Sequence, residues 1–236
     1  MFFEQYLSTF SRLDWIGLVW FLVCWVGHET IVERGWAGHK TLHQETHKLR
    51  LEWGRVMVRR NPRIVDVGLI NNLLQSLSFY ANTSIYIIAA LFAALGTLDQ
   101  LMATTSELPF SRSVSKEATE IKLLILIGVF VVAYFRFTWS LRQFNLLSIT
   151  LGSIPQEPPE EDIERYARKF AAVNSCAGND FNRGLRAYYF GMAVMSWMIS
   201  PWLFICSTLI IAVVLVRREY FSPVLNAFVD SQERVH

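Results

Sequence analysis

The 236-residue chain has few of the residues that stabilise small secreted proteins or hold zinc. It contains three cysteines, Cys24, Cys176 and Cys206, and none of them has a second cysteine at CxxC spacing. Two lie in apolar blocks and one in a polar stretch, so no pair is placed for a disulfide in an exported loop. The sequence therefore argues against a disulfide framework and against a cysteine-based zinc site.

An excess of charge of one sign and recognisable catalytic motifs are also lacking. The net charge is only +2, which gives no general signal for nucleic-acid binding. No GxGxxG, Walker A, GxSxG or paired-carboxylate motif occurs in the sequence. We therefore expect no nucleic-acid partner and predict no catalytic residue.

The N-terminal stretch has little basic charge. Arg12 is the only basic residue among the first 14, which also include Glu4 and Asp14. A secretory signal peptide begins with a basic region and ends at a small-x-small cleavage site, and neither feature is present here. We therefore interpret residues 15–27 as part of a retained helix.

Hydrophobic residues, by contrast, make up 53% of the chain and gather in long blocks. Such blocks are typical of membrane spans, because a soluble domain disperses its apolar residues in short periodic patterns. Four blocks predict spanning helices, at residues 14–33, 69–98, 121–145 and 187–216. The predicted fold class is one all-α integral membrane domain over residues 1–236, with four transmembrane helices and cytoplasmic loops at residues 34–68 and 146–186.

The third block lies within the longest helix-compatible stretch, residues 121–151. Its first half is apolar apart from Lys122, and its second half carries several polar side chains. A helix of this length would extend for about 46 Å, whereas a bilayer core needs only about 20 residues. We therefore expect this helix to cross the membrane and to continue beyond it.

Polar side chains follow one face of the second block and one face of the third. The second block has such residues at i, i+4, i+7 and i+11, namely Asn71, Gln75, Ser78 and Asn82. The third has them at i, i+4 and i+7, namely Arg136, Ser140 and Gln143, with Arg142 and Asn145 nearby. Two interpretations remain open: the stripes are packing contacts between helices, or they line a hydrated pathway or buried site. The two arginines can alternatively extend towards the cytoplasmic headgroups.

Basic residues are concentrated in two of the predicted loops. The loop after the first block holds Arg34, Lys40, Lys48, Arg50, Arg55, Arg59, Arg60 and Arg63. The loop before the fourth block adds Arg165, Arg168, Lys169, Arg183 and Arg186. The positive-inside rule then places both loops in the cytoplasm and both termini outside, in the periplasm.

Each basic loop also predicts a helix. Apolar residues recur with helical spacing between residues 40 and 60, which indicates a basic amphipathic helix that binds anionic lipid headgroups. The second helix begins at the acidic residues after Pro159 and is expected to stop at Gly178–Asn179. The following polar run, residues 179–186, is either a cap and turn or a small cytoplasmic site.

Three histidines, His39, His43 and His47, recur at i, i+4 and i+8 on one helical face. Two histidines at this spacing can share a divalent metal, with a third ligand from Glu33 or Glu45. The alternative is a solvated or headgroup-facing polar face that binds nothing. Since neither a cysteine cluster nor an HExxH pattern accompanies them, we predict no cofactor and keep the metal as a remote alternative.

Five segments together carry a resemblance to a known family: RNPRIVD (60–66), SFYANTS (78–84), RFTWSLRQFN (136–145), FNRGLRAYYF (181–190) and RREYFS (217–222). In these segments the chain resembles the family named domain of unknown function 599. That family consists of small multipass membrane proteins, mostly bacterial, so the resemblance implies a multipass protein of a bacterial inner membrane. It implies no activity.

These observations leave three hypotheses for function. The first is a non-enzymatic membrane module that self-assembles or joins a larger complex. The second is an oligomeric channel or transporter for a small solute or anion, lined by the polar stripes. The third is a metal-dependent membrane enzyme that uses the histidine face.

Overall fold

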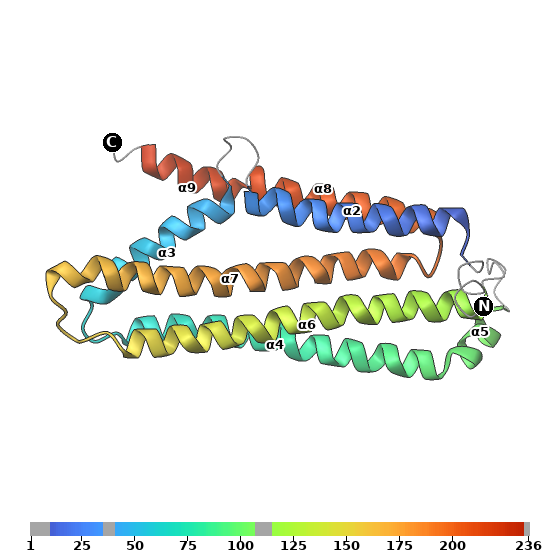
Figure 1. Cartoon of the computed structure of the whole chain (residues 1–236), viewed down its shortest axis with the longest axis horizontal. Helices are drawn as coiled ribbons and strands as arrows, with labels where there is room; N and C mark the ends of the chain where they lie inside the picture. Colours follow the sequence, from blue (N-terminus) through green and yellow to red (C-terminus); the bar gives the residue numbers. More distant parts are fainter. Residues whose placement is uncertain (1–9, 35–40, 107–114, 234–236) are drawn as a thin grey trace.

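The computed structural model describes residues 10–34, 41–106 and 115–233, and this part of the chain forms eight helices and no strand. They are α2 (Arg12–Arg34), α3 (Leu42–Arg59), α4 (Ile64–Gly96), α5 (Leu98–Ser106), α6 (Lys116–Gly152), α7 (Glu160–Ser196), α8 (Pro201–Tyr220) and α9 (Pro223–Glu233). The helices form an elongated bundle whose long axis follows α4, α6 and α7 (Figure 1).

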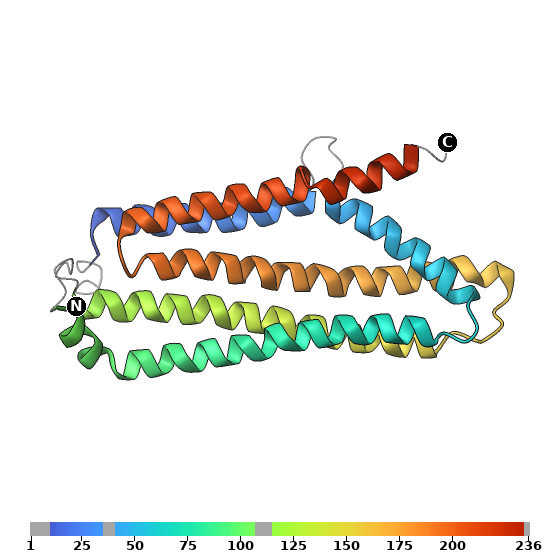
Figure 2. The same cartoon turned by 180° about the vertical axis from the view of Figure 1, so that it is seen from behind.

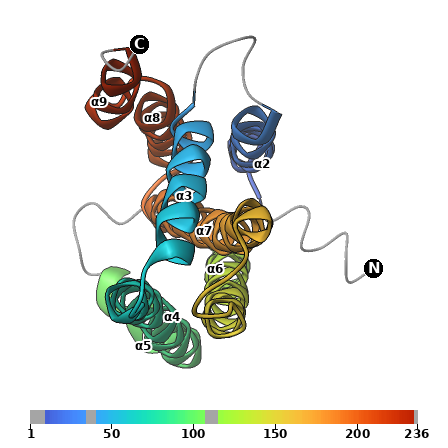
Figure 3. The ribbon, with the colours of Figure 1, turned by 90° about the vertical axis from the view of Figure 1, so that its left-hand side faces the viewer.

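The centre of the bundle is the pair α6 and α7, which lie side by side along most of their length (Figure 1). Helix α4 packs along α6, and its Tyr80 ring also contacts Phe181 and Tyr188 of α7. Helices α2 and α8 cover one half of α7, and α3 covers the other half, as both side views show (Figure 2). The end-on view separates α4 and α5 from α2, α8 and α9 on the opposite side of this central pair (Figure 3).

The three long helices exceed the thickness of a membrane. Helix α4 has 33 residues, and α6 and α7 have 37 each, so they extend for about 50 and about 55 Å, whereas a hydrocarbon core is about 30 Å thick. Helices α2 and α8, with 23 and 20 residues, match that thickness. We call the half of the bundle that contains them the α2–α8 half, and the remainder the α3 half.

Among the described residues, three segments are long and apolar enough to cross a membrane: Ile64–Gly96, Lys116–Gly152 and Pro201–Phe228. They indicate a membrane protein. The first predicted span, residues 14–33, corresponds to α2 but does not belong to this group.

The fourth predicted span, residues 187–216, is not one kinked helix. Helix α7 ends at Ser196, and α8 begins at Pro201 and runs back beside α2 and α7. The Ser200 hydroxyl accepts a hydrogen bond from the Leu203 N–H at 3.2 Å, and proline suits the first turn of a helix because its missing N–H needs no partner there. Pro201 therefore starts a new helix, and the prediction of a single span is wrong here.

The predicted stop at Gly178–Asn179 is also wrong, because α7 continues through both residues. Gly178 ends no helix; it provides room for a side chain of α3. A Cβ atom built on Gly178 would lie only 2.2 Å from Nη2 of Arg50. The glycine therefore marks a close helix–helix contact, which a one-dimensional pattern does not distinguish from a helix end.

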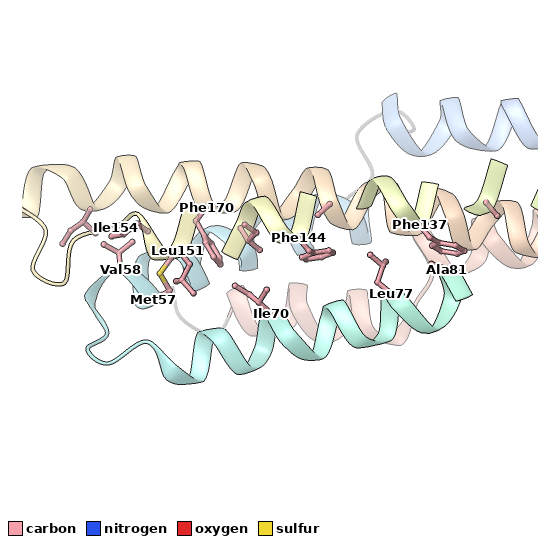
Figure 4. Packing of buried hydrophobic residues seen from close by; sticks show 14 of the residues in the cluster. Met57, Val58, Ile70, Leu77, Ala81, Phe137, Phe144, Leu151, Ile154 and Phe170 are labelled. Carbon is pink, nitrogen blue, oxygen red and sulfur yellow. The ribbon is translucent and has the colours of Figure 1, made fainter. Parts of the chain in front are cut away.

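Two clusters of buried apolar residues hold the bundle together. The cluster in Figure 4 joins Met57 and Val58 of α3 and Leu77 of α4 to Phe137 of α6 and Phe170 of α7. The second cluster lies in the α2–α8 half and contains Phe21, Phe130, Phe190, Trp197 and Phe204. The two clusters follow one another along α6 and α7, and the partly buried Trp25 and Tyr188 pack against both.

Candidate functional site

A basic cavity of about 510 Å³ lies between α3, α7 and the end of α8. It is lined by Leu42, His43, Thr46, Arg50, Asn179, Asn182, Arg183, Arg186 and Glu219. Three guanidinium groups and one carboxylate thus surround it. The cavity lies near the middle of the long axis, where α8 ends and α3 begins (Figure 1), so it is at the boundary between the two halves of the bundle.

The start of α3 forms one wall of this basic cavity. Thr41 caps the helix, since its hydroxyl accepts a hydrogen bond from the Gln44 N–H at 3.2 Å. The next free N–H, that of His43, donates to Oε1 of Glu219 at 3.0 Å. A carboxylate at a helix N-terminus is favourable because the helix dipole is positive there. This hydrogen bond therefore joins the start of α3 to the end of α8. It also offsets part of the negative charge of Glu219.

Arg50, which lies further along α3 than His43, also lines the cavity. Its side chain is half-buried against Gly178 of α7, and burial lowers the pKa of its guanidinium. A guanidinium nevertheless stays protonated in proteins. Within the described residues Arg50 forms no ion pair with a carboxylate, and burial is the cause of its pKa shift. A partly desolvated positive charge therefore faces the cavity.

An ion-pair network lies directly beside the basic cavity and joins α2, α6 and α7. The Asp180 carboxylate accepts hydrogen bonds from Nη1 of Arg136 at 3.2 Å and from Nε2 of Gln143 at 2.6 Å. Arg183 lies 3.5 Å from Asp180 and 3.2 Å from Glu29 of α2. The charge of Arg183 is therefore shared between the network and the cavity.

The predicted polar stripe of α6 packs against α7. Arg136 and Gln143 reach Asp180, and the Ser140 hydroxyl donates to the Ala177 carbonyl at 2.6 Å. The other two predicted residues, Arg142 and Asn145, are exposed, and the Arg142 guanidinium lies 5.3 Å from the centre of the Trp139 ring. The stripe thus places its three members in helix–helix contacts.

The predicted stripe of α4 lies on the opposite side of its helix from α6. Asn71, Gln75 and Asn82 are exposed and Ser78 is half-buried, whereas α4 faces α6 with buried residues such as Leu77. The two stripes are therefore not brought together. Within one copy of the chain they do not line a common pathway.

The histidine face is only partly described. His39 lies outside the described residues, His43 lines the basic cavity, and the exposed His47 has its Nδ1 2.8 Å from the Ser175 hydroxyl. No group of three or more His, Cys, Asp or Glu side chains in the described ranges is placed to hold a metal ion. His43 is thus part of the cavity wall, and His47 takes part in a contact between α3 and α7.

The basic residues predicted for the membrane surface contact protein groups. Arg55 pairs with Glu164 at 2.8 Å, and Arg59 pairs with Glu160, both across the α3–α7 boundary. Hydrogen bonds from Arg55 and Arg168 lower the pKa of Glu164 to about 2. The acidic start of α7 therefore complements the basic face of α3.

The other basic residues of this group stabilise local structure. Arg60 lies 2.8 Å from the fully buried Asp66, which also accepts a hydrogen bond from Nε1 of Trp53 at 2.8 Å. Arg63 donates to four backbone carbonyls, those of Met57, Val58, Ile154 and Pro155. Lys48 pairs with Glu45 at 2.7 Å. Headgroup binding by these side chains remains a prediction.

Sequence reasoning did not find Glu29 or Glu219 as members of the site, and it included Asp180 only within the polar run 179–186. A signal was available for part of it, because Asn179, Asn182, Arg183 and Arg186 recur at helical spacing and all four line the basic cavity. Of the two interpretations of residues 179–186, the cap and turn is therefore wrong, since this run lies inside α7.

Comparison with known proteins identifies the family. The profile of the family described as "Protein of unknown function, DUF599" matches residues 16–224, and the chain belongs to this family. This confirms the resemblance found in the sequence motifs. No curated protein and no solved structure matches the chain.

Proposed function

Since the chain belongs to a family without an assigned activity, we propose from its geometry that it is a non-enzymatic membrane module that self-assembles through the outer face of α4. We define this outer face as the exposed residues of α4 that point away from α6. Its members include Ile64, Val65, Leu69, Asn71, Leu73, Gln75, Phe79, Asn82, Tyr86 and Phe92.

We place the α2–α8 half within a bacterial inner membrane and the α3 half in the cytoplasm. Helix α8 has no charged residue before Arg217, and α6 has none between Lys122 and Arg136, as expected of segments in hydrocarbon. The α3 half holds most of the arginines and lysines, which favours the cytoplasmic side. Five helices, α2, α4, α6, α7 and α8, then cross the bilayer.

This placement changes the expected topology. Because the chain reverses between α7 and α8, five crossings put the start of α2 outside and α9 inside. The sequence-based expectation of two periplasmic termini counted residues 187–216 as one crossing. An odd number of crossings separates the two ends of the chain.

The observation that carries the self-assembly proposal is the length of the uncovered face of α4. The helix has no charged residue between Asp66 and Asp99, and it extends for about 50 Å against a bilayer core of about 30 Å. Ile64 and Val65 are 73% and 59% exposed at the end of the bundle farthest from α5 (Figure 2). Lipid therefore covers only part of this face, and burying the rest against protein is favourable.

A second copy of the chain fits this surface better than a charged partner. Two α4 helices meet without like-charge repulsion, because the outer face carries no charged side chain. Asn71, Gln75 and Asn82 can then hydrogen-bond across the contact, as polar side chains do between membrane helices. A two-fold axis makes one such patch sufficient for a closed dimer.

Cysteine cross-linking in native membranes tests this proposal. In a background with Cys24→Ala, Cys176→Ala and Cys206→Ala, Gln75→Cys should give a covalent dimer with a short bis-maleimide. The matched control is Val213→Cys on α8, which is 57% exposed on an apolar face and should stay monomeric. Equal cross-linking at both positions, or none at Gln75→Cys and at neighbouring α4 positions, would contradict the proposal.

A further inference from the structure

We propose that the basic cavity between α3, α7 and α8 binds a phosphate group, carried either by a lipid headgroup or by a soluble anion. This inference is independent of self-assembly, because no residue of α4 lines the cavity. It rests on the charge of the walls, on the partial burial of Arg50, and on the size and position of the cavity.

The charge of the walls favours an anion. Arg50, Arg183 and Arg186 outnumber the single lining carboxylate, Glu219. Glu219 accepts the His43 N–H, and Arg183 is partly balanced by Glu29 and Asp180. Arg50 has no such carboxylate among the described residues. Guanidinium groups bind phosphate through parallel charge-assisted hydrogen bonds, which are stronger than neutral ones.

Arg50 reaches from α3 to the surface of α7, which places its charge at the cavity wall. Its guanidinium lies against the backbone of Gly178, so that a Cβ atom at position 178 would come too close to it unless the arginine moved. A glycine in the middle of a 37-residue helix destabilises that helix slightly. At position 178 it leaves the space that the Arg50 guanidinium occupies.

The size of the cavity suits a phosphate with a further chemical group attached. Ligand cavities usually measure about 300–1,000 Å³, and this one measures about 510 Å³. Besides the arginines, the lining includes the apolar side chain of Leu42 and the amide of the exposed Asn182. These side chains can contact the group attached to the phosphate.

The position of the cavity fits either source of phosphate. Helix α8 ends with the exposed basic pair Arg217 and Arg218, as expected at the cytoplasmic headgroup level. Glu219 follows directly and lines the cavity. A headgroup at this level and a solute from the cytoplasm both have access, and the experiment must separate them.

The test measures binding to the purified full-length chain in a zwitterionic detergent. Inorganic phosphate and pyrophosphate represent the soluble source, and phosphatidylglycerol against phosphatidylcholine in mixed micelles represents the headgroup source. Isothermal titration calorimetry gives the dissociation constant. Thermal unfolding gives a second readout, compared between variants because phosphate also stabilises proteins non-specifically.

Two variants probe the site and one serves as a control. Arg50→Gln removes the partly buried charge, and Asn182→Asp adds a negative charge at an exposed position where folding is little affected. Arg55→Gln removes an arginine from the same helix that pairs with Glu164 outside the cavity. Each site variant should weaken binding by about tenfold or more, the equivalent of one lost charge-assisted hydrogen bond, and the control should bind like the unaltered chain.

The outcomes are distinct. Saturable binding of phosphate or pyrophosphate identifies a soluble ligand, and binding of phosphatidylglycerol alone identifies a headgroup; both support the proposal if Asn182→Asp and Arg50→Gln weaken them. Failure of all four probes to bind selectively overturns it. Equal binding by Asn182→Asp, Arg50→Gln and Arg55→Gln overturns it as well, even if the unaltered chain binds phosphate.

Discussion

The ammonium group of Lys122 lies 3.3 Å from the Asp14 carboxylate, and both side chains are almost completely buried. Nε1 of Trp197 donates to the same carboxylate oxygen at 2.6 Å, and Lys122 donates to the Trp197 carbonyl at 3.3 Å. One ion pair thus connects α2, α6 and the turn after α7. The lone charge in the apolar stretch 121–135 therefore has a structural partner far away in the sequence.

The first prediction concerns this ion pair. Lys122→Met leaves Asp14 buried without its counter-charge, and breaking a buried pair in this way costs about 3–5 kcal/mol. Asp14→Asn should also destabilise the fold, because it leaves the ammonium uncompensated. The double variant should recover much of the loss, since no buried charge remains. Unfolding midpoints in detergent measure this, and additive losses in the double variant would show that the two groups do not act as a pair.

The second prediction concerns the contact between α3 and α7. A Cβ atom on Gly54 would lie 2.8 Å from the backbone oxygen of Ala167, and backbone cannot move as easily as a side chain. Gly54→Ala should therefore lower the free energy of unfolding by about 1–3 kcal/mol, the usual cost of overpacking. Gly128→Ala is the matched control, because nothing lies within 4 Å of its Cβ position.

For this control the expected sign is opposite. Alanine is favoured over glycine inside a helix by about 1 kcal/mol, so Gly128→Ala should leave stability unchanged or raise it. Denaturant titration of the two variants side by side measures the difference. If both alanines had the same effect, the close approach of α3 to α7 would be refuted.

The third prediction concerns pH. The pKa of His43 lies below its ordinary 6.5 chiefly because of burial, with the charges of Arg50 and Arg186 acting in the same direction and that of Glu219 opposing them. Below pH 6.5 the unfolded chain therefore binds more protons at this residue than the folded chain does, and the free energy of unfolding decreases as the pH falls towards the lowered value.

The variant His43→Gln removes this proton uptake and keeps the backbone N–H that Glu219 accepts. Its unfolding free energy should therefore change less between about pH 7 and about pH 5 than that of the unaltered chain. Unfolding measured across this interval provides the comparison. Identical slopes for the two proteins would mean that His43 titrates alike in the folded and unfolded chains.

The fourth prediction uses the native cysteines to locate the membrane boundary. Cys176 of α7 is exposed in the α3 half, and Cys206 of α8 is exposed in the α2–α8 half. A membrane-impermeant maleimide should label Cys176 in inside-out vesicles and should not label it in right-side-out vesicles. Cys206 should react only after the membrane is dissolved. Labelling of Cys176 from the periplasmic side would reverse the orientation, and rapid labelling of Cys206 in intact vesicles would exclude a span at α8.

Helical periodicity and apolar blocks allowed the all-helical architecture to be predicted, including a helix at residues 121–151 that outlasts a bilayer; α6 ends at Gly152. The reversal at Pro201 and the continuation through Gly178 were not predictable in the same way. Proline can kink a helix or begin one, and glycine can end a helix or admit a neighbour. At Gly178 the tertiary partner Arg50 decides, whereas at Pro201 the local cap by Ser200 accompanies the start of a new helix, whose direction depends on its packing against α2 and α7.

The partners within the candidate site were likewise not predictable from local sequence. The α6 stripe of Arg136, Ser140 and Gln143 was visible from spacing. Its partner Asp180 lies on a different helix, α7, and no periodicity within α6 points to it. Likewise, Arg50 and Glu219 are far apart in the sequence. They line the same cavity because the Glu219 carboxylate accepts a hydrogen bond at the start of α3, the helix that carries Arg50. Long-range pairing of charges is a property of packing, and no local rule specifies it.

The most direct test of self-assembly through α4 is the mass of the complex extracted into native nanodiscs. We expect a particle with two copies of the chain, and a particle with one copy when Asn71, Gln75 and Asn82 are all replaced by leucine. The triple variant should remain folded, because these side chains are exposed in the single chain. A single copy in the unaltered protein, or two copies that persist in the triple variant, would contradict the account.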